Sequence, residues 1–209
     1  MELKEQKGSG LALIIGSILM IATMVLHPVG GDFNHLLSIV TIGMVSHSIA
    51  IISVPFVAYG FWGLTARLSS ESFLSKVGFS IMFFGLIAVM IAAATNGIIL
   101  MDFVKSYEEA SKETLKSLAP IFVFIRSFNH AFDFIFIGAV CISTLLWSIS
   151  IVRTKKLAVW LGWFGISISL LAVLFLTLGF VFVDLHGFRL FIFGWVAWVV
   201  AAGLCLLKK

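Results

Sequence analysis

Long runs of apolar residues alternate along the chain with short segments that carry most of the charges. A helix that crosses the hydrocarbon core of a bilayer needs about 20 apolar residues, and a soluble core has no use for several runs of that length. The pattern therefore predicts an all-α integral membrane protein, a six-helix bundle that forms a single domain over residues 1–209. The predicted spans are residues 11–27, 43–64, 77–96, 120–151, 157–183 and 190–207, with a connecting helix outside the membrane at about 106–119.

Local signals refine the ends of these helices. The second span is expected to begin earlier, near Asn34, and the fourth is longer than a bilayer requires, so both should tilt or project beyond it. Ser106 and Glu109 have the spacing of a capping box, which predicts that the connecting helix begins there. Pro120 should close that helix, and Pro55 should kink the second span.

The basic residues are distributed unequally between the two ends of the spans. Cytoplasmic segments of membrane proteins are enriched in Lys and Arg, so the richer side predicts cytoplasmic termini and a location in the cell membrane, or in the inner membrane of a Gram-negative bacterium. Five basic residues fall on the outer side, and nine fall on the cytoplasmic side: Lys4, Lys7, Arg67, Lys76, Arg153, Lys155, Lys156, Lys208 and Lys209.

A faint internal repeat accompanies this topology. Aligning His47 with His130 brings Trp62 near Trp147 and also matches several apolar segments. The alignment suggests a duplicated helical hairpin, with spans two and three repeated as spans four and five.

Composition narrows the class of function. The net charge of +4 arises from residues at the helix ends, where they set orientation, so it does not indicate a partner nucleic acid. The two cysteines, Cys141 and Cys205, both lie inside apolar runs. Their positions argue against a disulfide framework and against a thiolate metal site.

The fourth span carries the most conspicuous polar pattern. Arg126, Asn129, His130 and Asp133 are spaced at i, i+3, i+4 and i+7, so a helix places them on one face. Ionisable side chains at membrane depth are costly and normally face a bundle interior or a wet cavity. This stripe therefore marks a candidate functional site.

Counting across the membrane brings other polar groups to the same depth. Twenty helical residues span about 30 Å, the thickness of the hydrocarbon core. Four intervals of 20 residues join a basic residue at the predicted cytoplasmic side to a polar residue at the other side: Lys7 to His27, Arg67 to His47, Lys76 to Asn96 and Arg153 to Asp133. These four polar residues should therefore lie at one outer level, and Asp184 and His130 should lie near it.

The preferred interpretation is an outward-facing pocket that binds a small molecule, a lipid head group or a metal ion. An arginine can pair with an anionic group, while histidine and asparagine donate hydrogen bonds. Arg126 could equally pair with an aspartate simply to hold helices together. The candidate ligand-binding residues are Arg126, Asn129, His130, Asp133, Asn96 and Asp184.

Metal binding is one version of this hypothesis. His27, His47, His130 and Asp133 offer the nitrogen and oxygen donors that zinc prefers, and a bound zinc could activate water against a lipid. An outer set of histidines with an aspartate is similar to the sites of alkaline ceramidases and their receptor relatives, which are membrane hydrolases. Those proteins have seven spans and paired histidines on one late helix, whereas the last stretch here carries only His186. We therefore assign the chain to no family.

Haem or quinone binding is a further alternative. Two facing imidazoles are needed for bis-histidine haem ligation, and His47 with His130 would be the best-placed pair. The sequence decides neither the cofactor nor whether the protein is an enzyme.

Overall fold

The computed structural model describes residues 2–69 and 72–208, and in these ranges all the regular structure is helical, with no strand. Six helical stretches are long and apolar enough to cross a membrane. They identify a multi-pass helical membrane protein. The stretches are α1 (Leu3–Leu26), α3 (Val40–Leu68), the continuous run Phe73–Ser106, α7 (Ala119–Thr154), α8 (Val159–Thr177) and α9 (Leu185–Leu207).

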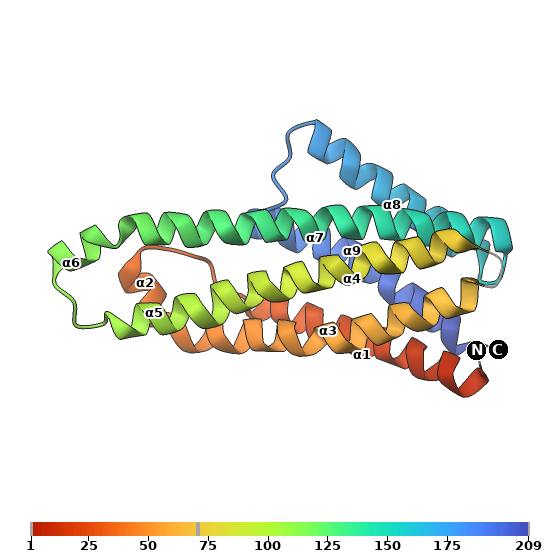
Figure 1. Ribbon diagram of the computed structural model, residues 1–209, viewed down its shortest axis with the longest axis horizontal. Coiled ribbons are helices and arrows are strands. Elements are labelled where there is room, and N and C mark those ends of the chain that lie inside the picture. Colours follow the sequence, from red (N-terminus) through yellow and green to blue (C-terminus); the bar gives the residue numbers. More distant parts are fainter. Residues whose placement is uncertain (1, 70–71, 209) are drawn as a thin grey trace.

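These helices form an elongated bundle in which both ends of the chain lie at the same end (Figure 1). The helix α1 packs against α3 and α9, while α7 packs against α4 (Phe73–Ala93) and α8. Two short helices, α2 (Phe33–Ser38) and α6 (Lys112–Ser117), lie at the opposite end. An even number of spans accounts for the neighbouring termini. The side of the membrane on which they lie stays a prediction, and one residue of the charge count, Lys209, falls outside the described residues.

The third helical stretch is longer than expected. It was predicted to end near Asn96, but it continues from α4 through the π-helix η1 (Ala94–Ile99) into α5 (Leu100–Ser106). The extension is stabilised because Leu100, Met101 and Val104 are buried in a small apolar cluster with Leu36 and Ile125. With α7, which has 36 residues and is about 54 Å long, the stretch projects beyond a hydrocarbon core of about 30 Å.

The predicted cap of the connecting helix is wrong. The hydroxyl of Ser106 donates to the carbonyl oxygen of Asp102 within α5, at 2.9 Å. The connecting helix is α6, and its cap is Ser111, whose Oγ accepts from the backbone N–H of Thr114 at 3.2 Å. Serine spacing alone could not distinguish the two, because a serine inside a helix bonds back to its own preceding turn.

The α8 helix ends six residues before the predicted limit of the fifth span. Gly179 adopts the left-handed conformation with φ of +84°, which a glycine reaches without a steric penalty. The N–H of Phe180 then donates to the carbonyl oxygen of Phe175 at 2.9 Å, and the two rings pack with centroids 5.8 Å apart. This is a Schellman motif, and it releases the chain from α8 into the connection that leads to α9.

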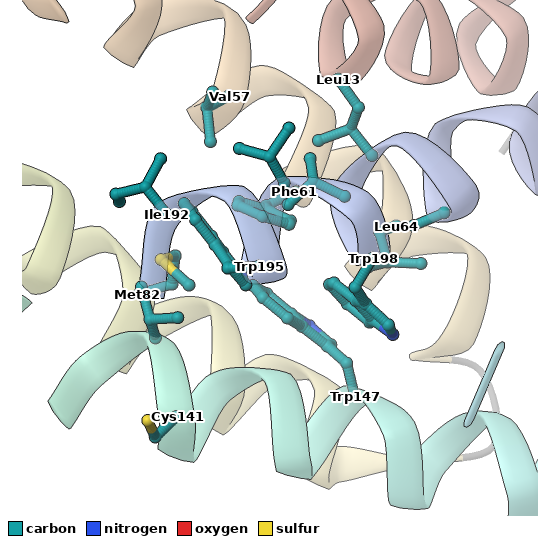
Figure 2. Packing of buried hydrophobic residues seen from close by; sticks show 14 of the residues in the cluster. Leu13, Val57, Phe61, Leu64, Met82, Cys141, Trp147, Ile192, Trp195 and Trp198 are labelled. Carbon is teal, nitrogen blue, oxygen red and sulfur yellow. The ribbon is translucent and has the colours of Figure 1, made fainter. Parts of the chain in front are cut away.

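An aromatic core packs between α3, α7 and α9 (Figure 2). The indole of Trp147 stacks on Phe61, with centroids 4.6 Å apart, and on Trp198 at 6.2 Å. Its Nε1–H donates to Thr65 Oγ1 at 3.0 Å and to the carbonyl oxygen of Ser75 at 3.1 Å. Trp147 is thus fully buried with its polar atom satisfied, whereas Trp62, its counterpart in the suggested repeat, is 44% exposed.

Small residues bring α1 and α9 into backbone contact. A Cβ on Gly10 would lie 2.7 Å from the carbonyl oxygen of Gly203, and one on Gly203 would lie 2.9 Å from that of Gly10. Membrane helices associate through such close approaches because lipid offers no hydrophobic drive between them. This contact holds α1 and α9 side by side.

Candidate functional site

A cavity of about 600 Å³ opens between the helices toward the end opposite the termini. Its walls come from the ends of α1 and α3 that lie away from the chain termini, from η1, from α7, and from the start of α9 with the connection before it. All eight residues that the sequence indicated as ligands line this one cavity: His27, His47, Asn96, Arg126, Asn129, His130, Asp133 and Asp184.

The α7 wall carries the polar stripe. Asp133 is 8% exposed, and its Oδ2 accepts a hydrogen bond from Asn129 Nδ2 at 2.6 Å. Across residues 2–69 and 72–208, no arginine, lysine or histidine forms an ion pair with this carboxylate. Arg126, two helical turns away on the same face, is exposed at the cavity rim. The wall therefore presents the buried carboxyl group of Asp133 and, at the rim, the guanidinium of Arg126, and the two do not bond to each other.

The α3 wall contributes a buried imidazole. His47 is 5% exposed, and its Nδ1 lies 2.8 Å from the carbonyl oxygen of Gly43. Since a carbonyl oxygen only accepts, Nδ1 carries the proton and Nε2 of the neutral ring is an acceptor. Asn96 Nδ2 lies 3.4 Å from Nε2, a distance at the long end for a hydrogen bond.

The π-helix sets the position of Asn96 against that imidazole. Its neighbour Gly97 is buried, and a Cβ there would overlap the Cβ and Cγ atoms of His47. Only glycine therefore lets η1 approach α3 so closely. Single π turns within α-helices are frequent at functional sites. Helix periodicity does not predict this turn, although Asn-Gly inside an apolar run is a local signal of irregular structure.

The end of α1 supplies a second imidazole. His27 follows the last residue of α1, and its Nδ1 lies 2.9 Å from the carbonyl oxygen of Pro28. Its ring lies against that of His47, with centroids 4.6 Å apart. Burial lowers the pKa of His27 below the usual 6.5; the bond to Pro28 opposes this effect, and the nearby Arg189 adds to it. Near pH 7 the ring is therefore neutral.

Two charged residues at the start of α9 hold the cavity wall together. Asp184 is the N-cap of α9, and its Oδ1 accepts from the N–H of Gly187 at 2.7 Å. Arg189 donates from Nε to the carbonyl oxygen of Met24 at 3.1 Å and from Nη2 to that of His27 at 2.6 Å. Asp184 thus has a capping role besides its place at the cavity, and Arg189 joins α9 to α1.

The cofactor hypotheses receive unequal support from this geometry. His27 and His47 adjoin each other, but the described residues contain no group of three or more His, Cys, Asp or Glu side chains that could hold a metal ion. His130, expected opposite His47 for haem, lies on the α7 wall, and the ring that contacts His47 is His27. Metal and haem binding stay predictions.

Apolar residues that the sequence analysis did not single out complete the cavity. Met24 comes from α1, Leu36 from α2, and Val89 and Phe188 from α4 and α9. Counting across the membrane found the polar members because charge and depth are visible in sequence. It could not find the apolar members, since an apolar residue facing a cavity is indistinguishable in sequence from one facing lipid. Comparisons of the sequence with models of known protein families, and of the chain with curated proteins and solved structures, find no match.

Proposed function

We propose that this multi-pass membrane protein uses the polar cavity to bind a small molecule or lipid head group that carries an amine. The observation that supports this most directly is Asp133, a carboxylate buried in the cavity wall with one amide as its hydrogen-bond partner. A buried carboxylate is costly unless a positive charge or several hydrogen bonds compensate it. An ammonium group on a ligand supplies that compensation.

Arg126 extends the proposal to the opposite charge. It lies seven residues before Asp133 on the same helix face, about 10.5 Å away along the axis. Within residues 2–69 and 72–208 it forms no ion pair with an acidic side chain. An exposed guanidinium at the rim suits a phosphate or carboxylate group, which it can bind through two parallel hydrogen bonds. The ligand we propose is therefore zwitterionic, with its amine inward and its anionic group outward.

The imidazoles would then serve as neutral hydrogen-bonding groups. The Nε2 atom of His47 is an acceptor, and so is that of His27 if the bond to Pro28 holds the proton on Nδ1. Both suit the remaining N–H groups of a bound amine. The distribution of basic residues supports cytoplasmic termini. Since the cavity lies toward the other end of the bundle, it would open to the outside of the cell.

Thermal stabilisation by ligands tests the proposal. The full chain is purified and placed in phosphatidylglycerol nanodiscs, whose head groups carry no amine. It is then melted with phosphoethanolamine, glycerophosphoethanolamine and simple amino acids, each beside its N-acetylated form. We expect at least one free amine to raise the melting temperature, and its acetylated form to have no effect, because acetylation removes the positive charge.

Asp133→Asn is the decisive variant, with Asp102→Asn as its control. Asp102 is exposed on α5 and does not line the cavity. Stabilisation should disappear in Asp133→Asn and persist in Asp102→Asn. If Asp133→Asn is stabilised as strongly as the wild type, or if no amine stabilises the wild type, the proposal is wrong.

A zinc-dependent hydrolase of lipid esters or amides is the second candidate. One observation favours it: a carbonyl oxygen holds Nδ1 of both His27 and His47. Metal-bound histidines commonly bond in this way through the nitrogen that does not bind the metal. Metal analysis of the purified protein distinguishes the candidates. About one zinc per chain, lost in His47→Ala and His130→Ala, would favour the hydrolase. A Soret band in the visible absorption spectrum of the same sample would instead favour haem binding.

A further inference from the structure

A second cavity, of about 260 Å³, lies between α7, α8 and α9. Its walls are almost entirely apolar and include Val140 on α7, Ile168 and Ala172 on α8, and Phe191 and Trp195 on α9. The α8 helix diverges from the rest of the bundle toward its end at Thr177 (Figure 1). No part of the polar site described above belongs to it.

The two cavities share a wall. Phe182 lines the apolar cavity and the next residue, Val183, lines the polar one, so the connection between α8 and α9 separates them. On α9 the change from one cavity to the other occurs between Phe188 and Leu190. Their separation is therefore the thickness of a few side chains.

Aromatic rings form that partition. Phe136 of α7 packs against Phe188, which lines the polar cavity, with centroids 6.3 Å apart. It also meets the edge of Trp195, which lines the apolar cavity, at 5.7 Å. Phe182 contacts Phe191 at 5.6 Å.

The apolar cavity also contains a polar atom without a partner. Ser169 is 4% exposed and lines the cavity, and its hydroxyl has no hydrogen-bond partner. Buried hydroxyls are normally satisfied because leaving one unpaired is costly.

We infer that the ligand of the polar cavity is an amphiphile, and that its hydrocarbon chain occupies the apolar cavity. This inference rests on the proposed function, since it assigns the polar cavity to the head group. A hydrocarbon chain fits because the walls are apolar, the surrounding solvent is lipid, and the consecutive residues Phe182 and Val183 line the apolar cavity and the head-group site. The ligand class is thus a lipid with an amine in its head group.

Glycine 194 allows the apolar cavity to be filled selectively. Gly194 lines this cavity, and a Cβ at its position would meet no other part of the chain within 4 Å. Gly194→Leu should therefore place a side chain in the cavity without disturbing the backbone. Gly138→Leu is a matched control, because Gly138 on α7 has equally open space and lines neither cavity.

Equilibrium binding of two probes to the full chain in phosphatidylglycerol nanodiscs tests the inference. Lysophosphatidylethanolamine carries one hydrocarbon chain, and glycerophosphoethanolamine carries the same head group without it. We expect Gly194→Leu to bind the lysolipid about tenfold more weakly than the wild type, the loss expected when about two buried methylenes are displaced. Its binding of glycerophosphoethanolamine should be unchanged, which also shows that the variant is folded, and Gly138→Leu should bind both probes like the wild type.

The outcomes separate this inference from the proposed function. If Gly194→Leu binds the lysolipid as tightly as the wild type, the inference is overturned, whereas the proposed function stands if Asp133→Asn still loses both probes. If Asp133→Asn retains both probes, the proposed function fails and the assignment of the head group fails with it. Absence of saturable lysolipid binding to the wild type overturns the inference as well.

Discussion

Arg189 donates a hydrogen bond from Nη2 to the carbonyl oxygen of His27 over 2.6 Å, which joins the start of α9 to the end of α1. A second bond from Nε reaches the carbonyl oxygen of Met24. The last carbonyl groups of a helix lack partners within the helix and lie at its negative end, so a guanidinium satisfies both needs. The arginine therefore keeps His27 at the cavity by holding the backbone that carries it.

Replacing this arginine should destabilise the protein. We expect Arg189→Ala to lower the free energy of unfolding by about 2–3 kcal/mol, because hydrogen bonds from a charged donor are lost and two carbonyl oxygens are left unpaired. Thermal unfolding in detergent measures the loss. Lys105→Ala, at an exposed residue of α5, is the control. Equal melting temperatures for the two variants would show that the contact contributes nothing.

The indole N–H of Trp147 offers a test of the core. Trp147→Phe replaces the indole with a smaller aromatic ring, and Thr65 Oγ1 and the carbonyl oxygen of Ser75 lose their buried donor. We expect this substitution to lower the free energy of unfolding by about 1–3 kcal/mol. Trp62→Phe, at the exposed position, should change the midpoint of chemical unfolding little. A Trp147 variant as stable as the Trp62 variant would contradict the structure of this core.

The close contact of Gly97 with His47 predicts that a methyl group added at residue 97 destabilises the protein. Gly97→Ala would overlap the imidazole and must displace it or push η1 away from α3, at about 1–3 kcal/mol. Gly138→Ala meets open space and should be neutral or stabilising by up to about 1 kcal/mol. Thermal unfolding of both variants, measured side by side, checks the difference. The prediction fails if the two substitutions have the same effect.

The lowered pKa of His27 predicts a pH dependence with a definite sign. Between the usual value of 6.5 and its lower value in the folded protein, the unfolded chain binds more protons at this group. The contribution of the neutral His27 ring to the free energy of unfolding is therefore complete above pH 6.5, and it is lost as the pH falls through that value toward the folded-state pKa. The melting temperature should fall over this range, and it should fall less steeply in His27→Gln. His35→Gln, at an exposed residue, should keep the wild-type slope; a His27→Gln slope as steep as the wild type would refute the assignment.

Labelling in intact cells tests the orientation. In a background with Cys141 and Cys205 replaced by alanine, a cysteine is introduced at Lys112 or at Arg153, which are both exposed and lie on opposite sides in the predicted topology. A membrane-impermeant thiol reagent should label Lys112→Cys and spare Arg153→Cys, because the richer basic side is cytoplasmic. The reverse pattern would place the cavity inside the cell.

The sequence alone determined the six spans and the polar stripe on α7, and it predicted a common depth for His27, His47, Asn96 and Asp133. These features follow from hydropathy and from the fixed rise of the α-helix, and both act along a single helix. That is why counting from charges at the helix ends brought four residues to the wall of one cavity. The errors arose where one turn departs from a regular helix: at η1, at the cap of α6 and at Gly179.

Only the tertiary structure decided which helices meet and what they enclose. It placed the ring of His27 against His47, joined Arg189 of α9 to the end of α1, and left an apolar cavity between α7, α8 and α9. In a membrane, a side chain that faces lipid and one that faces another helix are equally apolar, so hydropathy carries no record of the partner. The choice depends on close packing at residues such as Gly10, Gly97 and Gly203, which takes effect only when two helices are brought together.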